Sequence, residues 1–444
     1  MIRFLTLMCG FLLASCAAEV ARVQTSEETV ARRLDYPYES SETCSACHSP
    51  IYQQYQVSEH SRSFSNPLFQ AQYFNEVVPR AERDPAMRTE ARRCIYCHAP
   101  VVFMNFTGLI SRPEQAGVFE TGISCDFCHT LYGYQANGDY RQNPSQRKLG
   151  PLQQVSHHSE YSGWVEMSDF CGPCHNASNH RDLPVKATFT EWRESPFREK
   201  RIMCQDCHMN KIGYLVNGSA EYEQGAAAHL SIGYDTRNHA RSDHQKLHTH
   251  AFPGAHSNTQ IEGALRLEVL PSGDGAPGFK VRVNNERSGH RMPSGSSELR
   301  FLTLLVSARD SRGNEVPVEL VSSPAEPVDY GIAGAFSGDT VLLGSAIPSG
   351  SRLYRSIFLD ADGRPAPSFI DAASIAFDNR LKAGEVREEE YYLAQQPGAA
   401  GKLTVTASLV YRSAPAAVTS RLGVPAATPV TIASVTRTLM PGAR

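Results

Sequence analysis

Ten cysteines of this chain form five pairs, and a histidine follows each pair directly. The motif is Cys-x-x-Cys-His, and only Cys9 and Cys16 lie outside it. With 16 histidines in 444 residues, chance does not place one after all five pairs. The paired cysteines are Cys44 and Cys47, Cys94 and Cys97, Cys125 and Cys128, Cys171 and Cys174, and Cys204 and Cys207.

The spacing explains what such a motif can bind. Thiols three residues apart lie on one face of a helical turn, so both can form thioethers to the vinyl groups of one porphyrin. The next residue then directs its imidazole at the iron. We therefore predict five covalently attached haem c groups, with these proximal iron ligands: His48, His98, His129, His175 and His208.

Two other readings of the cysteines explain less. Zinc ribbons use cysteine pairs two at a time, which would leave one of the five pairs unused. Disulfides suit an exported chain, but they give no reason for the histidines. If all ten cysteines carry haem, none remains for a structural disulfide.

The motifs lie between residues 44 and 208, which leaves about 33 residues for each. Units this small usually need a metal, disulfides or a cofactor to be stable. We therefore predict that the haems themselves form the core, wrapped by short helices and long loops. One such helix is expected within residues 49–64. Adjacent haems should then be close enough to pass electrons directly.

The second axial position decides between two kinds of chemistry. A protein ligand on both faces of the iron makes an electron carrier, whereas an open face permits substrate chemistry. More histidines remain than the five positions require. They are His60, His157, His158, His180, His229, His239, His244, His248, His250, His256 and His290.

Several segments resemble the multihaem c-type cytochromes of the cytochrome c-552/c-554 kind. They are CSACHSPIYQQYQVSEH, GISCDFCHTLYG, HHSEYSGWVEMSDFCGPCHNASN, TFTEWRESPFREKRIMCQDCHM and HAFPGAH. The resemblance implies distal ligands at His60, at His157 or His158 with His158 preferred, and at His250. Tyr55 stands where the family commonly has tryptophan, which affects packing more than ligation.

Two features complicate this assignment of ligands. Residues 238–256 hold five histidines, and a loose zinc-binding tract is the alternative interpretation of such a cluster. YQVSEH (residues 55–60) and WRESPF (192–197) share their aromatic and serine spacing, but the second ends in Phe197. Phenylalanine cannot bind iron, so we predict that Phe197 packs against a porphyrin edge. One iron could thus lack a local ligand.

Beyond residue 260, alternating apolar residues and turn-rich gaps predict an antiparallel, immunoglobulin-like β-sandwich; a β-barrel is the alternative. VRVNNERSGHRMPSG (281–295) resembles a loop of the β domain that follows the haems in many of these cytochromes. It implies that His290 is a distal ligand donated across the domain interface, with Met292 a packing residue. The predicted fold class is α+β multidomain, with a haem domain at 44–259 and a sandwich at 260–444.

The N-terminus has the layout of a secretory signal, with an apolar stretch too short to span a bilayer. Its end, Leu-Ala-Ser-Cys, resembles a bacterial lipobox, which predicts a signal at 1–16, lipidation of Cys16 and a tether at 17–43. Ordinary signal cleavage that discards Cys16 is the alternative. Ala17 favours the outer membrane within the bacterial envelope. A net charge of −3 argues against nucleic-acid binding.

Two functions from different classes follow. The first is a pentahaem lipoprotein that carries electrons between redox partners. The second is a reductase or oxidase of a small nitrogen or sulfur compound, with one open haem. The chain lacks the Cys-x-x-Cys-Lys site of pentahaem nitrite reductases and a hydroxylamine-oxidoreductase-type tyrosine cross-link, which favours the carrier. Phe197 and the unassigned fifth ligand favour the enzyme. The β domain could also dock a partner or form oligomers.

Overall fold

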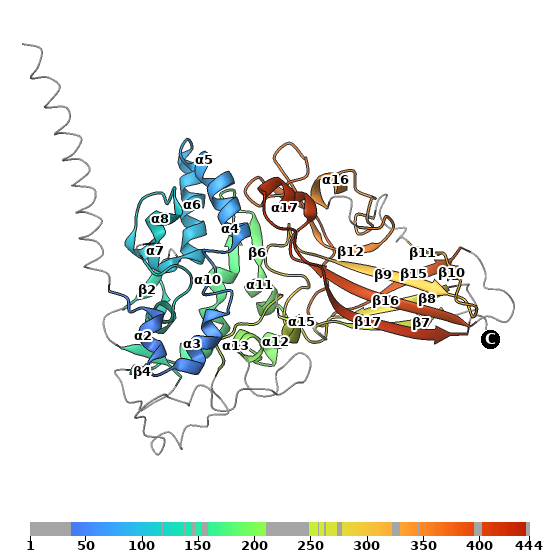
Figure 1. The fold of residues 1–444 in the computed structure, drawn as a ribbon, viewed down its shortest axis with the longest axis horizontal. Coiled ribbons are helices and arrows are strands. Elements are labelled where there is room, and N and C mark those ends of the chain that lie inside the picture. The colour runs from blue at the N-terminus through green and yellow to red at the C-terminus, as the bar shows by residue number, and fades with distance from the viewer. Residues whose placement is uncertain are drawn as a thin grey trace, which may run out of the picture.

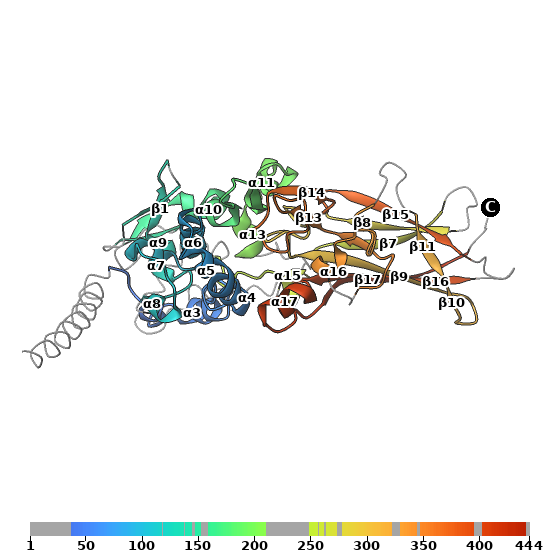
Figure 2. The same ribbon diagram turned by 90° about the horizontal axis from the view of Figure 1, so that it is seen from above.

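The computed structural model describes residues 37–440, apart from 118, 137, 144–146, 152–158, 210–247, 256, 262, 273–277, 322–328, 344–346 and 395–401. Two bodies lie in line, a helical N-terminal body and a two-layered β body (Figures 1 and 2). This arrangement confirms the predicted α+β class. Among the described helices, none combines the length and the apolar character needed to cross a membrane.

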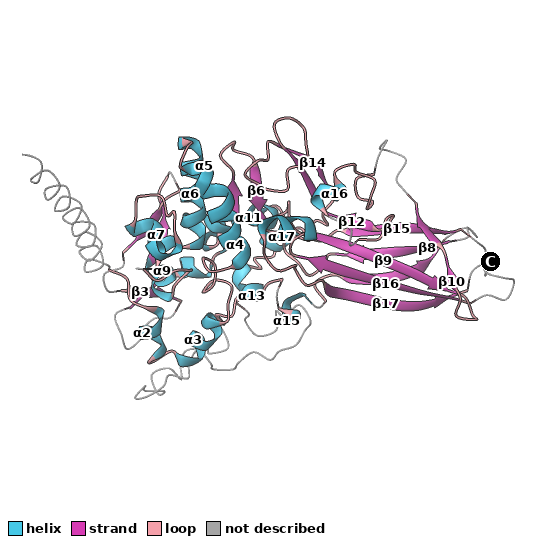
Figure 3. Ribbon diagram, turned by 45° about the horizontal axis from the view of Figure 1, so that its top comes forward, coloured by secondary structure: helices cyan, strands magenta, loops and turns pink. Residues whose placement is uncertain are grey.

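The N-terminal body consists of short helices joined by loops, as Figure 3 shows by colour. Its helices are α2 (Ser41–Ser45), α3 (Ser49–Gln56), α4 (Pro67–Ala71), the π-helix η1 (Gln72–Val77), α5 (Val78–Ala81), α6 (Pro85–His98), α7 (Pro100–Asn105), α8 (Pro113–Ala116), α9 (Cys125–Thr130), η2 (Gly163–Glu166), η3 (Ser168–Phe170), α10 (Gly172–His175), α11 (Thr188–Arg193), α12 (Pro196–Glu199), α13 (Cys204–His208) and α15 (Asn258–Ile261). Many begin with proline in the first turn, where the missing N–H is not needed.

Small two-stranded sheets, which the sequence analysis did not predict, tie the loops of this body together. They pair β1 (Leu131–Tyr134) with β2 (Tyr140–Gln142), β3 (Lys148–Gly150) with β4 (Ser159–Tyr161), and β5 (Asn176–Ser178) with β6 (Pro184–Ala187). Strands of three or four residues have too little periodicity to be recognised from sequence.

The helices from α4 to α7 correct one expectation. They follow one another closely and enclose a cluster of buried apolar side chains that includes Tyr73, Val77, Ala91 and Val102. The polypeptide therefore contributes a core of its own beside the motifs. The average of 33 residues per motif concealed this, because 45 residues separate His48 from Cys94. That interval is long enough to pack helix against helix.

The C-terminal body is a sandwich of two main antiparallel sheets. One has the order β11-β15-β8-β7, and the other β10-β9-β16-β17 with β12 also paired to β9. The strands are β7 (Arg266–Pro271), β8 (Gly278–Asn284), β9 (Phe301–Arg309), β10 (Glu315–Val316), β11 (Val318–Leu320), β12 (Arg352–Tyr354), β13 (Ser356–Leu359), β14 (Ser374–Asp378), β15 (Val386–Leu393), β16 (Leu403–Arg412) and β17 (Val430–Leu439). Strand β14 and the helices α16 (Asp339–Leu342) and α17 (Ala416–Leu422) were not predicted.

Alternation of side chains explains why these segments form strands. Along β8, Phe279, Val281 and Val283 are buried while their neighbours are not. They meet Leu304 and Leu409 from the other sheet in one apolar cluster. Such two-residue periodicity places every second side chain between the sheets.

The two bodies share an extensive interface. The β13–β14 loop sends Ile370 into the apolar cluster of the helical body. Beside it, the Asn179 amide donates to the carbonyl oxygens of Phe369 and Ala372 at 2.8 and 2.7 Å. Helix α17 packs against α4 around Val418. The sandwich is therefore positioned to contribute residues to a site in its neighbour.

Candidate haem sites

A single cavity of about 2030 Å³ occupies the helical body and reaches the edge of the sandwich. Pockets for one small ligand are roughly 300–1,000 Å³, so this space suits several large groups. All ten motif cysteines line it. So do nine histidines: His48, His60, His98, His129, His175, His208, His248, His250 and His290.

Short helical turns present the motif cysteines to this cavity. Helix α9 begins at Ser124, whose hydroxyl accepts a hydrogen bond from the Phe127 N–H at 3.2 Å. This cap starts the turn at the first cysteine of the motif, so that Cys125 and Cys128 share a face. The motif at Cys94 instead occupies the last turn of the longer helix α6.

Three pairs of imidazole rings face each other across the cavity. The ring centroids of His60 and His175 are 6.3 Å apart, those of His129 and His250 are 6.1 Å apart, and those of His208 and His290 are 6.2 Å apart. Two imidazoles on opposite faces of one metal, each with a metal–nitrogen distance of about 2 Å, have ring centres roughly 6 Å apart. Each pair combines a motif histidine with one from a distant segment.

Backbone carbonyl groups orient several of these rings. The Nδ1 atom lies 2.8 Å from the Ser63 oxygen in His98, 2.7 Å from the Leu149 oxygen in His129 and 2.8 Å from the Pro253 oxygen in His208. A carbonyl oxygen only accepts, so Nδ1 carries the proton. Nε2 is thereby left with a free lone pair, as a metal ligand requires.

Burial favours the neutral form of four of the paired histidines. It lowers the pKa of His60 to about 4 and the pKa values of His175 and His250 to about 3. It also lowers the pKa of His208, and the nearby His290 adds to that shift. Neutral imidazole is the form that binds metals.

The cysteines show which motifs are neighbours in space. Cys44 lies in side-chain contact with Cys125, Cys97 with Cys174, and Cys171 with Cys204. These contacts link the first motif to the third, the second to the fourth and the fourth to the fifth. The third and fourth motifs are also close enough for Cys128 and Cys174 to interact electrostatically. The five motifs thus form one connected cluster rather than separate sites.

The alternative uses of the cysteines find no support in the structure. Each of the ten is a free thiol in this structure. No group of three or more potential metal ligands of the zinc type occurs among residues with a described position. The ten motif cysteines and their five histidines all line one cavity, which is an arrangement that fits covalent haem.

Several residues named in the sequence analysis fall outside the described residues or outside the three facing pairs. His157 and the preferred His158 lie outside the described residues, as do His229, His239, His244, His256 and Cys16. The ring of Phe69 stacks on that of His98 with a centroid distance of 3.9 Å, and no second histidine ring faces His98 among the residues that the structure describes. His180 lies away from the cavity, in a small surface hollow beside Arg80.

His248 is a cavity residue that could hardly be singled out from the sequence. It is buried, it lines the cavity, and its Nε2 lies 3.9 Å from a carboxyl oxygen of Glu166. The sequence analysis left it without an assigned iron, as one of four histidines in residues 238–256 that were either spare or the source of the fifth distal ligand. The available signal in the sequence was its position two residues before His250. In a loop, however, the spacing of two histidines does not determine where either side chain points.

The comparison of YQVSEH with WRESPF also acquires a physical meaning. Tyr55 and Trp192 are both buried, and so are the serines that follow them. Phe197, which takes the place of His60 in the second copy, lines the cavity and packs against the Gly289 backbone. A Cβ atom added at Gly289 would lie 3.3 Å from the Phe197 ring. The second copy thus supports the loop that carries His290.

Comparison with known proteins found two similarities, one of sequence and one of fold. Residues 43–130 match the family of cytochrome c554 and c-prime. The fold is similar to that of a penta-heme cytochrome c552 from Thermochromatium tepidum, with a TM-score of 0.61 and 21% identity over 91% of this chain and 100% of that chain. A search of curated proteins gave no match. With the motifs, these findings confirm the predicted resemblance to multihaem c-type cytochromes of the c-552/c-554 kind.

Proposed function

We propose that the protein carries five covalent haem c groups and transfers electrons between redox partners. The facing imidazole pairs support this proposal. In three pairs the ring centroids are separated by the distance expected for two ligands of one iron, and all three lie in the cavity that the ten cysteines line. When bound, haem c supplies a one-electron Fe(III)/Fe(II) couple. The penta-heme neighbour, which covers nearly the whole chain, supports the count of five.

In this proposal the ligand pairs are His175 with His60, His129 with His250, and His208 with His290. Each distal histidine comes from a different segment, and His290 comes from the sandwich. The cysteine contacts indicate which haem groups would be neighbours. The first group would lie next to the third, and the fourth would lie next to the second, the third and the fifth. Apolar lining residues such as Phe127 and Trp192 exclude water between them.

The remaining parts of the proposal concern place and partners. The signal-type N-terminus and the cytochrome class support a location outside the cytoplasm. A lipid anchor at Cys16, an outer-membrane location, binding to protein redox partners and oligomer formation extend this proposal. A test is the mass of the mature protein, in which a lipidated Cys16 at the N-terminus adds the mass of its acyl chains.

Electron paramagnetic resonance of the ferric protein, integrated against total haem, tests the ligand pairs. We expect five haems per chain and low-spin signals for at least three. In His290→Ala, one haem equivalent should change from low spin to high spin. An unchanged spectrum in the variant would remove His290 from the proposal, and fewer than five haems would remove the count.

A second function is favoured by one observation, the absence of a described histidine ring opposite His98. An iron held there by His98 alone would have a free face for a small nitrogen or sulfur compound. A high-spin signal in the wild-type protein that disappears on addition of cyanide or nitrite would support this enzyme. A wild-type protein that is entirely low-spin and binds neither anion would exclude it.

A further inference from the structure

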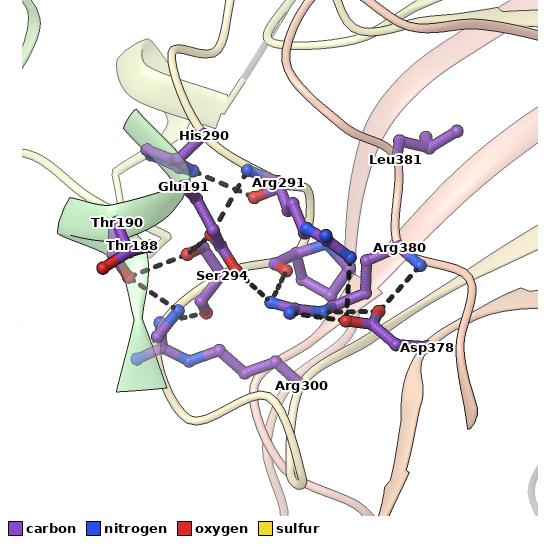
Figure 4. Close-up of polar contacts among 12 residues, drawn as sticks. Thr188, Thr190, Glu191, His290, Arg291, Ser294, Arg300, Asp378, Arg380 and Leu381 are labelled. Carbon is purple, nitrogen blue, oxygen red and sulfur yellow. Dashed lines mark hydrogen bonds and ion pairs between the residues drawn. The ribbon is translucent and has the colours of Figure 1, made fainter. Parts of the chain in front are cut away.

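The residues around His290 include a charged group buried at the interface of the two bodies. Arg380 follows strand β14, and only 7% of its side chain is exposed. Removing a guanidinium group from water is costly unless its donors are paired. Arg380 meets that cost through contacts with both bodies (Figure 4).

On the sandwich side, Arg380 binds Asp378 with two parallel contacts. Its Nε and Nη2 atoms lie 2.9 and 2.8 Å from the carboxyl oxygens of Asp378. The same carboxylate accepts from Arg291 Nη1 at 3.0 Å. Burial would raise the pKa of Asp378, but Arg380 and Arg291 together lower it below its usual value. Asp378 is therefore a negatively charged residue held by two arginines next to the loop that carries His290.

On the other side, Arg380 reaches helix α11 of the haem-binding body. Its Nη1 atom lies 2.9 Å from Oε1 of Glu191 and 3.2 Å from the carbonyl oxygen of Pro293. The second oxygen of Glu191 accepts from the Ser294 hydroxyl at 2.7 Å and from the Arg291 N–H at 3.3 Å. Glu191 thus binds the residue that directly follows His290.

The sandwich holds the other end of the loop through hydrogen bonds. The amide of Asn285, which is fully buried, donates to the carbonyl oxygens of His290 and Leu381 at 3.1 and 3.0 Å. Met292 and Leu381 exchange two backbone hydrogen bonds. Two residues of helix α11 connect this frame to the helical body: Glu191, and Thr188, whose hydroxyl lies 2.8 Å from the Ser294 hydroxyl and accepts from the Gly295 N–H at 3.2 Å. Of the two, Glu191 holds the residue next to His290 and carries the charge that pairs with Arg380.

We infer that Glu191 and Arg380 are positioning residues for His290, and that their ion pair couples the docking of the sandwich to the axial ligation of the haem at Cys204–His208. The inference rests on the proposed function, because it takes His290 to be that distal ligand. A ligand donated by another domain binds strongly only when its loop is ordered beforehand. The Glu191 carboxylate and the Arg380 guanidinium provide that order from opposite sides of residues 291–294.

The test uses the full-length protein loaded with haem and compares Glu191→Gln with Glu389→Gln. Glu389 forms an equally buried pair with Arg352, at 2.8 Å, inside the sandwich and away from the cavity. Each variant removes the negative charge of one buried ion pair and leaves the arginine in place. Spin state by electron paramagnetic resonance, melting temperature and the response to added imidazole are measured for each.

We expect Glu191→Gln to convert part of one haem equivalent to high spin, and added imidazole to restore the low-spin signal. Arg380→Lys, which keeps the charge but not the forked geometry, should show a smaller conversion. Glu389→Gln should lower the melting temperature without any high-spin signal. A Glu191→Gln protein that melts earlier but stays low-spin would overturn the inference and leave a structural ion pair.

His290→Ala separates this inference from the proposed function. If His290→Ala remains low-spin, the ligand assignment itself fails. If His290→Ala gains one high-spin iron and Glu191→Gln gains none, only the positioning role fails. Should Glu191→Gln not accumulate, Ser294→Ala removes one donor to the same carboxylate and is expected to give a smaller high-spin fraction, whose absence would count against the inference.

Discussion

The two bodies of this protein are stabilised in different ways. The sandwich fills its interior with its own side chains, because β8, β9 and β16 direct alternate apolar residues into one cluster. The helical body keeps an apolar cluster around α4 to α7 but surrounds a cavity of about 2030 Å³. Close-packed interiors do not sustain such a space when it is empty. The sandwich therefore forms its core from its own side chains, whereas the helical body would need the haem groups that its cysteines are proposed to bind.

The largest effect should come from omitting the cofactor. We expect chain made without haem attachment to lose hydrogen-exchange protection in α9, α10 and α13, while β8 and β16 keep theirs. The reason is that the first set surrounds the cavity and the second surrounds a side-chain core. Mass spectrometry of exchanged peptides measures both at once. Equal protection in the two bodies would contradict the comparison.

A cavity mutation in the sandwich tests the same contrast from the other side. Leu409 is fully buried between the sheets, so Leu409→Ala should reduce the free energy of unfolding by about 2–5 kcal/mol. The haem spectrum should not change before the sandwich unfolds. Thr404→Ala, on the less buried face of the same strand, is the control and should cost about 0.5 kcal/mol or less. Denaturant titration followed by circular dichroism gives both values.

A glycine in the helical body tests whether backbone packing supports a distal ligand. Gly122 has φ of +89°, and an added Cβ would lie 2.5 Å from the Ser61 oxygen and 2.9 Å from the His60 oxygen. We expect Gly122→Ala to displace His60 and to alter the low-spin signal of one haem. Gly138 has φ of +86° with nothing within 4 Å of an added Cβ.

Gly138→Ala is therefore the matched control, since it introduces the same backbone strain without the collision. It should cost about 1–2 kcal/mol of stability and leave every resonance signal in place. Electron paramagnetic resonance and melting curves are measured on both variants. Identical spectra for the two would show that the close approach of Gly122 to His60 has no role in ligation.

The smallest expected effect is a pH dependence at Glu298. This carboxyl is buried, and neither of its oxygens accepts a hydrogen bond from another residue with a described position. Burial raises its pKa above 4.5, although Lys186, Arg300 and Arg380 act in the opposite direction. The folded state therefore holds the proton more tightly than the unfolded state.

A raised carboxyl pKa stabilises the fold at low pH, and that stability is lost as the pH rises from 4.5 through the folded pKa. At pH 7, Glu298→Gln should consequently increase the free energy of unfolding by about 1 kcal/mol or less and raise the melting temperature. Near pH 4 the substitution should bring no such increase. Melting curves across this range measure the effect. A benefit that is the same at both pH values would exclude titration as its cause.

Local patterns made much of the molecule predictable. Cysteines three residues apart with a following histidine identify haem attachment without knowledge of the fold, because the reacting groups share one helical turn. Alternation along segments such as 279–283 and 403–409 identified the sandwich strands. The three-residue strands β2 to β5 were missed, because they are too short to show a period. The helical core between residues 67 and 105 was also missed, because an average spacing concealed it.

The sequence by itself therefore predicted haem c and the motifs that would attach it, since covalent attachment depends on neighbours along the chain. Only the tertiary structure decided that His60 faces His175, that His250 faces His129 and that His290 faces His208. A second axial ligand needs proximity in space and not in sequence. The same holds for Glu191 and Arg380, which meet across 189 positions of chain because two separately folded surfaces pack together.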